Sequence, residues 1–173
     1  MWALSLLAVS TAAVLAACEP DSTNSPPSPT PSPTSVPTPT PVATAATDVL
    51  VLRVGAGKFI VEVADDTIER AAGLSGRDSL AQGTGMWFAY PTVGHPSFWM
   101  RGMRFPIDLV WVDASLRVVA VIHQVPSPLA GATVDDLPLY SPGAPIMYVL
   151  EINAGQAVDL GIAAGELVSL ESP

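Results

Sequence analysis

The residues best suited to bind a ligand lie between positions 87 and 104, where aromatic and basic side chains gather. They are Trp87, Phe98, Trp99, Met100, Arg101, Met103 and Arg104. An aromatic face beside a guanidinium suits a sugar ring, a peptide or an anionic small molecule. Because side chains alternate along an extended segment, Phe98 and Met100 share one side, and Trp99 and Arg101 share the other. We expect the side with Trp99 and Arg101 to be the less buried one and to line a binding groove. The alternative is that Trp99 and Met100 are core residues and the arginines are solvated.

Two carboxylates stand within apolar segments. Asp108 alternates with Val110 and Val112, and Glu151 lies in the apolar run from Met147 to Ile152. Two desolvated carboxylates with raised pKa values could act as an acid and base pair. The favoured interpretation is structural, because a buried unpaired charge costs several kcal/mol, on the order of 3–5.

The structural interpretation predicts a partner for Asp108. Arg77 follows a predicted helix that must pack on the sheet, and a guanidinium offers two parallel donors to one carboxylate. We therefore predict an ion pair between Asp108 and Arg77, with Arg70 as the second choice. The candidate binding residues are then Trp99, Arg101, Asp108, Arg77 and Glu151, and no catalytic residue, metal or cofactor is predicted.

Other chemistries find little support in the sequence. The stretch from Gly73 to Gly76 lacks the glycine spacing of a serine hydrolase nucleophile elbow. His95 and His123 are the only histidines, and their separation has no metal-ligand pattern. The single cysteine, Cys18, lies outside the segment that can fold, which excludes a disulfide or a cysteine nucleophile there.

The elements that position these residues are short. Alternation or apolar runs predict strands at 59–64, 85–90, 97–100, 107–112, 117–125, 146–152 and 165–170. A helix over 67–74 is capped by the 65–67 segment with Glu69 in its first turn, and Asn153 is expected to cap a second helix over 154–160. Pro91 is expected to stop its strand, and 126–145 is a loop. This pattern predicts an α+β fold: a small β-rich barrel or a strongly curved sheet with two short helices.

Composition divides the chain into three parts. Residues 1–17 are almost wholly apolar, 18–47 are rich in proline, serine and threonine, and 48–173 have the mixture that folds as one globular domain. The net charge is −9 with only seven basic residues, which argues against nucleic acid as a partner.

The first part is an apolar run that is too short for a typical membrane span and ends in Leu15-Ala16-Ala17-Cys18. These four residues resemble a lipobox, and the whole segment resembles the signal peptide of a bacterial lipoprotein. The resemblance implies cleavage before Cys18, lipidation of its thiol, and a location on the extracytoplasmic side of the membrane. The alternative is an uncleaved N-terminal helix anchor.

The second part is predicted to be a tether. Residues 19–47 contain nine prolines and twelve Ser or Thr residues and no Lys or Arg, so they cannot form a core. We expect this segment to be extended and disordered and to hold the domain away from the bilayer.

The third part contains a series of motifs in a fixed order. They are Glu69 to Leu74 with Arg77, Gly85-Met86-Trp87-Phe88, Phe98-Trp99-Met100-Arg101 with Pro106 to Asp108 and Asp113, Tyr148 to Gly155, and Gly161 with Gly165. Together these motifs resemble the domain of unknown function 192 family. The resemblance covers about 58–170 and implies no established activity. Gly102 stands where relatives usually place Asn, and the 126–145 loop lacks the cysteine pair often found there.

Together these features predict a lipid-anchored, extracytoplasmic binding or accessory domain for a small molecule or a cell-envelope component. The alternatives are an enzyme that uses Asp108 or Glu151 as acid or base, and a structural or protein-interaction module. A pocket that gathers Trp99, Arg101 and an unpaired carboxylate favours the first two. A flat surface with every carboxylate bonded to an arginine favours the third.

Lipidation is tested by Cys18→Ser, which removes the thiol that receives the lipid. We expect the variant to leave the membrane fraction, as measured by fractionation and immunoblotting of cells producing either form. A variant that stays membrane-bound at full length would show that the apolar segment is itself the anchor.

Overall fold

A computed structural model describes residues 49–171. The predicted signal peptide, the predicted lipidation site Cys18 and the predicted tether lie outside these residues. The elements in chain order are β1 (Val49–Val54), β2 (Gly57–Ala64), α1 (Thr67–Ala72), β3 (Thr84–Gly94), β4 (Ile107–Val112), β5 (Val118–Val125), a 3-10 turn (Val134–Asp136), β6 (Ile146–Asn153), α2 (Gln156–Asp159) and β7 (Ser169–Glu171). Among residues 49–171, no helix combines the length and apolar character that crossing a membrane requires.

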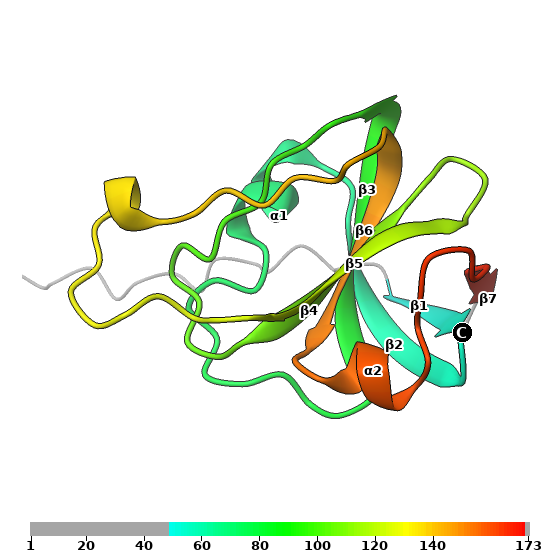
Figure 1. Cartoon of the computed structure of the whole chain (residues 1–173), viewed down its shortest axis with the longest axis horizontal. Coiled ribbons are helices and arrows are strands. Elements are labelled where there is room, and N and C mark those ends of the chain that lie inside the picture. Colours follow the sequence, from blue (N-terminus) through cyan, green and yellow to red (C-terminus); the bar gives the residue numbers. More distant parts are fainter. Residues whose placement is uncertain (1–48, 172–173) are drawn as a thin grey trace, which may run out of the picture. The chain divides into compact units, whose positions relative to one another are not determined.

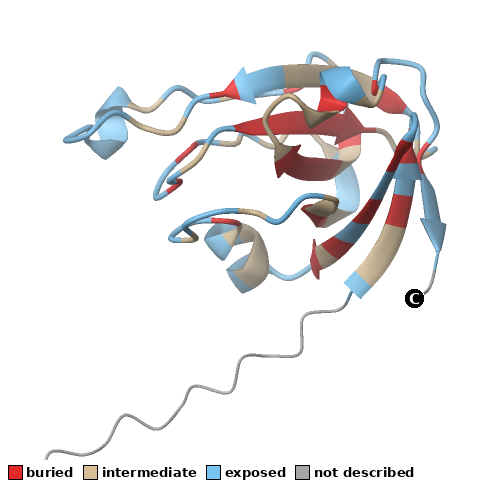
Figure 2. Ribbon diagram, turned by 90° about the horizontal axis from the view of Figure 1, so that it is seen from below, coloured by how far each residue is buried: buried red, intermediate tan, exposed pale blue. Residues whose placement is uncertain are grey.

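The strands form one seven-stranded sheet in the order β5-β4-β6-β3-β2-β1-β7 (Figure 1). All neighbouring pairs are antiparallel except β2 and β3, which run parallel because α1 and the loop after it carry the chain across. The mostly β architecture with two short helices was predicted. The sheet does not close into a barrel, so that version of the prediction is wrong, while a strongly curved sheet is compatible with the view in Figure 2.

The segment just before β7 lies beside the start of β5, so it joins the two opposite edges of the open sheet. The Val118 amide donates to the Glu166 carbonyl at 2.9 Å, and the Val168 amide donates to the Leu116 carbonyl at 2.8 Å. The chain then continues directly into β7, which pairs with β1 at the far edge. The described sheet thus has its edges linked by this segment without a continuous strand ladder.

Both faces of the sheet are covered, which explains why every residue of β4 except Asp108 is apolar. All six of its residues are buried, and it lies between β5 and β6, as predicted for a central strand. One face, here called the α2 face, carries Val110, Val112 and Ile152 and packs on α2 through Ala157. The other, the α1 face, carries residues such as Met86 and Leu109 and packs on Leu74 and the loop before β4. Figure 2 shows these buried residues concentrated in the strands.

Helix α1 begins as its sequence predicts. Asp66 caps the helix by accepting a hydrogen bond from the Glu69 amide at 2.7 Å, and the Glu69 side chain accepts from the Asp66 amide in return. This capping box satisfies two donors that the first turn would leave unpaired. The helix ends at Gly73, whose φ of 49° is unfavourable for residues with a side chain.

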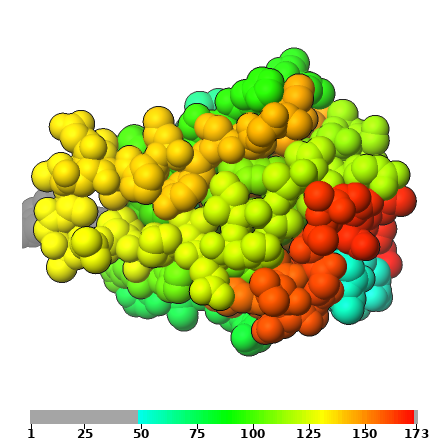
Figure 3. Space-filling model, in the orientation of Figure 1, coloured from blue at the N-terminus to red at the C-terminus, as the bar shows by residue number. Residues whose placement is uncertain are grey.

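Other local predictions are corrected by the structure. Strand β1 was not predicted, and 97–100 is not a strand, because only Phe98 pairs there, as a single bridge to Tyr140. Strand β3 continues through Pro91, since its pairing with β6 is interrupted between Ala89 and Gly94 and no ladder donor is required there. The 126–145 loop is confirmed and projects at one end of the face drawn in Figure 3, where its atoms are yellow.

Asp108 does not pair with an arginine, and that prediction is wrong. The residue is fully buried on β4, and its two carboxyl oxygens accept hydrogen bonds from the Gln124 amide at 2.7 Å and the Ala157 amide at 2.9 Å. The Ala157 amide belongs to the first turn of α2, so Asp108 satisfies a donor there. The predicted cap, Asn153, instead donates its side-chain amide to the Leu80 carbonyl at 2.9 Å.

These bonds predict a large cost for Asp108→Ala, because two backbone amides lose their acceptor, one of them buried. We expect the free energy of unfolding to fall by roughly 3 kcal/mol, as measured by urea denaturation. Asp113→Ala is the matched control, since Asp113 also accepts from two backbone amides, those of Ser115 and Arg117, but at an exposed turn. Water can replace that acceptor, so we expect a loss of about 1 kcal/mol or less. Equal losses in the two variants would contradict the role given to burial of Asp108.

Candidate functional site

A pocket opens on the α1 face between helix α1, strands β3 and β6, and the segment from Ser97 to Met103. Its volume is about 80 Å³. Glu151 lines it from β6, Tyr90 from β3, Arg70 from α1 and Trp99 from the loop. An adjoining hollow of about 380 Å³ shares Arg70 and Trp99 with this pocket and adds Arg101 to the lining. The two hollows form one groove lined by four polar side chains, Glu151, Tyr90, Arg70 and Arg101, and by the Trp99 indole.

Glu151 is the most unusual residue of the groove. It is 6% exposed, and its carboxyl group makes no hydrogen bond or ion pair with any described residue. Burial raises its pKa to about 8, although Arg77 opposes the shift. The carboxyl group is therefore mostly protonated at neutral pH, and it can donate as well as accept a hydrogen bond.

Arg70 and Tyr90 form one wall. The guanidinium of Arg70 donates from Nη1 to the Ala89 carbonyl at 2.9 Å and also to the Asp65 carbonyl, which ties α1 to β3. It lies over the Tyr90 ring, 5.1 Å from the centroid, at a distance suited to a cation–π contact. Burial raises the pKa of the Tyr90 phenol, which keeps that group neutral.

Trp99 and Arg101 form the rim, and the prediction that theirs is the less buried side is confirmed. Trp99 is 43% exposed and Arg101 is exposed, whereas Phe98 is half-buried and Met100 is buried. The Arg101 guanidinium lies 5.6 Å from the centroid of the Trp99 ring. The residues share a loop that is not a strand, but the predicted alternation holds across these four positions.

Two hydrogen bonds hold this rim against the end of α1. The Ser75 hydroxyl donates to the Arg101 carbonyl at 2.7 Å, and the Gly76 amide donates to the Gly102 carbonyl at 2.8 Å. Gly102 has a φ of 71°, a left-handed conformation that glycine and asparagine adopt most readily. Gly102 therefore permits the backbone geometry that the rim requires.

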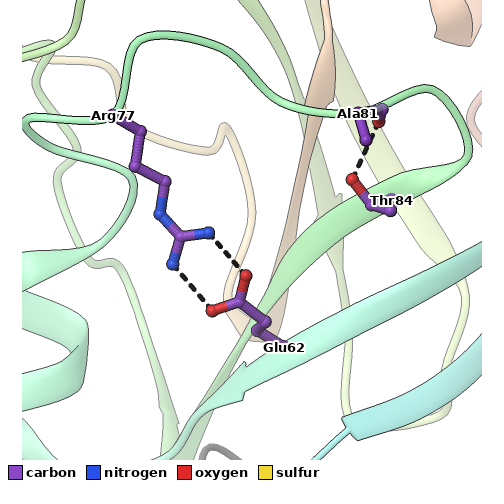
Figure 4. Close-up of polar contacts among 4 residues, drawn as sticks. All are labelled: Glu62, Arg77, Ala81 and Thr84. Atoms are coloured by element: carbon purple, nitrogen blue, oxygen red, sulfur yellow. Dashed lines mark hydrogen bonds and ion pairs between the residues drawn. The ribbon is translucent and has the colours of Figure 1, made fainter. Parts of the chain in front are cut away.

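Arg77 pairs with Glu62 rather than with Asp108. Its Nη2 lies 2.7 Å from Oε2 of Glu62, and a second bond from Nη1 makes the contact bidentate (Figure 4). Both side chains are about one-third exposed. The hydrogen bond from Arg77 lowers the pKa of Glu62, and the pair fixes the loop after α1 to β2.

Strand register excludes the alternative in which Asp108 and Glu151 form an acid and base pair. Glu62, Met86, Glu151 and Leu109 lie directly opposite one another on β2, β3, β6 and β4, so they share the α1 face. Asp108 lies opposite Ile152 and therefore points to the α2 face. Asp108 and Glu151 are thus on opposite sides of the sheet and cannot act as an acid and base pair.

The structure therefore gathers only part of the predicted site. Trp99 and Glu151 line the same pocket, Arg101 lines the adjoining hollow, and Asp108 lies away from both. Arg77 lines neither hollow, but its charge acts on Glu151. Sequence reasoning did not place Tyr90 or Ser75 in the site. Within residues 49–171, no three His, Cys, Asp or Glu side chains are placed to hold a metal ion.

The raised pKa of Glu151 predicts a pH-dependent effect of Glu151→Gln. The folded state retains a proton that the unfolded state releases above its ordinary pKa of 4.5. Wild-type stability is therefore fully present below that pH and is lost as the pH rises to about 8. Relative to wild type, Glu151→Gln should gain roughly 1 kcal/mol of unfolding free energy per pH unit across this window, as measured by urea denaturation.

Glu62→Gln is the control with the opposite sign. Arg77 lowers the pKa of Glu62, so this carboxylate stabilises the wild type above its ordinary pKa of 4.5, and the contribution is lost as the pH falls. A Glu151→Gln difference that does not change between pH values near 5 and 8 would show that Glu151 is not held neutral by burial.

Comparisons with known proteins agree with the fold and give no activity. A crystal structure from Novosphingobium aromaticivorans DSM 12444, of a protein of unknown function, is similar with 28% identity, a TM-score of 0.62, and coverage of 75% of this chain and 89% of that one. Another, from Sinorhizobium meliloti 1021 and described as a "putative transcription regulator", is similar with 21% identity, a TM-score of 0.65, and coverage of 73% and 96%. Among curated proteins, none matches the chain. Residues 50–170 match the model of the DUF192 family, described as "Uncharacterized ACR", and the chain therefore belongs to the DUF192 family, as its motifs predicted.

Proposed function

We propose that this chain is a lipid-anchored, extracytoplasmic binding domain that takes a small ligand in the groove between Glu151 and Trp99. The observation that carries the proposal is the buried carboxyl group of Glu151, which lines a pocket without a partner among the described residues. Among the described residues, the fully buried side-chain atoms without a hydrogen bond are Trp111 Nε1 and Gln156 Oε1, so the Glu151 oxygens are open to the pocket. A ligand that bonds to this carboxyl group gains the net contribution of a hydrogen bond, about 0.5–1.5 kcal/mol.

The exposed indole of Trp99 supports the same proposal. Large exposed aromatic side chains beside a pocket are common in binding sites, because their rings offer apolar area with little conformational entropy to lose. Arg101 already lies over this ring, so a planar or sugar ring has a stacking surface and a cation within reach. The structural alternative, in which every carboxylate is bonded to an arginine, receives less support because Glu151 has no such bond.

The location of the domain is a separate part of the proposal. It rests on the lipobox-like Leu15-Ala16-Ala17-Cys18 and on the proline-rich 19–47 segment. A tether of that composition would hold the groove away from the bilayer, where soluble or cell-wall ligands can reach it.

An enzyme that uses Glu151 is the second candidate. Its specific support is the raised pKa of about 8, which places a proton donor in the pocket at neutral pH. Asp108 is not part of this candidate, because both of its oxygens are bonded to backbone amides on the α2 face. The Ser75 hydroxyl donates to the Arg101 carbonyl, and no described histidine lines the pocket to activate it.

Binding is tested by screening the purified chain against cell-wall fragments, sugars and small carboxylic acids, with thermal shift and NMR as readouts. We expect a hit to perturb the Trp99 indole signal. Trp99→Ala should weaken its affinity about tenfold, the effect of losing roughly 1.4 kcal/mol. Leu139→Ala is the control, since it also removes an exposed apolar side chain but lies outside the groove.

The fate of a bound ligand separates the two candidates. A binding domain returns it unchanged after long incubation, whereas an enzyme converts it and loses that activity in Glu151→Gln. A ligand that binds equally well to Trp99→Ala and to wild type would contradict the placement of the site in this groove.

A further inference from the structure

Positive charge predominates around the groove. Arg70 and Arg101 line it, and Arg77 lies close enough to act on Glu151. The charge of Arg77 is offset by Glu62 through their bidentate contact. No carboxylate among the described residues bonds to Arg70 or Arg101. Glu151 does not offset them either, since its carboxyl group is mostly protonated at neutral pH.

Arg101 differs from most other cations of the domain in having its donors available. Three arginines form ion pairs: Arg53 with Glu171, Arg77 with Glu62, and Arg104 with Asp78. Arg117 donates to the Gly165 carbonyl, and Arg70 donates to two carbonyls. The guanidinium of Arg101 makes no hydrogen bond with a described residue. It lies over the face of the Trp99 ring. In a chain with a net charge of −9, an unpaired arginine beside a pocket is a specific feature.

We infer that the groove selects an anionic ligand, one whose carboxylate-type oxygens accept hydrogen bonds from the Glu151 carboxyl group and from Arg101 while its ring or carbon skeleton lies on Trp99. This inference rests on the proposed binding function and adds the charge of the ligand. A protonated carboxyl group donates strongly to an anionic oxygen, and a guanidinium offers two donors to one carboxylate.

A cationic ligand is disfavoured by the same groups. It would have to approach between Arg70 and Arg101, and like charges in a partly buried site repel strongly. A neutral sugar meets no repulsion but leaves the donors of Arg101 without an anionic partner. The order expected from the structure is therefore anionic, then neutral, then cationic.

The test uses ligands matched in shape and different in charge. Glucuronate, glucose and glucosamine form one series, and benzoate with benzamide forms another. Each is titrated at millimolar concentrations into the purified full chain near pH 6, with the Trp99 indole signal followed by NMR. We expect the anionic member of each series to bind about tenfold more tightly than the neutral one, a difference of about 1.4 kcal/mol.

The variants assign the effect to residues. Arg101→Gln should remove the preference for the anion. Lys58→Gln is the matched control, because it deletes one exposed positive charge outside both hollows. Glu151→Gln should make the affinity for the anion independent of pH, since its amide donates a hydrogen bond in every protonation state of the solution.

The pH profile gives an independent readout. Wild-type affinity for the anion should decline above about pH 8 as Glu151 loses its proton, and the Glu151→Gln profile should stay flat. The charged or titratable groups that line the pocket with Glu151 are Arg70 from α1 and Tyr90 from β3. The charge of Arg77, from the loop after α1, also acts on it, and Glu62 on β2 pairs with that arginine. The same pH profile is measured for His95→Gln as a control, because His95 lies four residues before Trp99 along the chain.

The possible failures are distinguishable. Equal or tighter binding of glucose, benzamide or glucosamine at the Trp99 signal would overturn the anionic preference and leave the binding function in place. Loss of anion binding in Glu151→Gln would overturn the role of a protonated carboxyl group. The absence of any response at Trp99 to all five probes would overturn both this inference and the proposed function.

Discussion

The buried carboxyl group of Asp108 is the constraint on which the arrangement of the described sheet depends. It lies on the central strand β4 and bonds at once to β5 and to α2. Opposite it, the β4–β5 register shifts between the pairs Ile107–Val125 and Leu109–Ile122, so one residue of β4 faces two of β5. Gln124, one of those two, has a φ of 51°, which costs a residue with a side chain of order 1 kcal/mol. The bond from its amide to Asp108 offsets this strain.

That constraint also sets the face on which Glu151 lies. The register that places Asp108 opposite Ile152 places Leu109 opposite Glu151. Side chains alternate along both strands, so fixing one carboxylate on the α2 face fixes the other on the α1 face. The two carboxylates then have different surroundings. Asp108 receives two backbone donors, whereas Glu151 receives none from the described residues and is left protonated by desolvation. An apolar residue at this position would avoid the desolvation of a carboxyl group, so the described packing itself does not require Glu151.

The sequence predicts local structure here better than partnerships across the sheet. The capping box at Asp66, the fully buried β4 and the exposed side of Trp99 follow from spacing and alternation, which are properties of the chain itself. The partner of Arg77 depends on strand order, because only the row formed by β2, β3 and β6 brings Glu62 and Glu151 to one face. Alternation within β2 already puts Glu62 on the side opposite Phe59 and Val61, a signal that marks it as the accessible carboxylate for an arginine on that face.

The charged residues of the two strongest family motifs are used differently. In the motif from Glu69 to Leu74, both charged side chains are committed to the backbone: Glu69 closes the capping box, and Arg70 ties α1 to β3 through two carbonyls. In the motif from Phe98 to Arg101, Phe98 and Met100 pack inward, and the outward Trp99 and Arg101 contact each other. Structural need accounts for the first motif and for half of the second. The hydrogen bond from Gly76 holds the left-handed backbone at Gly102. The outward side chains, Trp99 and Arg101, therefore have a fixed place at the groove that Glu151 lines. A preformed aromatic and cationic rim beside a neutral carboxyl group would bind the proposed ligand without the entropy loss of ordering the loop, which is the physical advantage of building the proposed site on this motif.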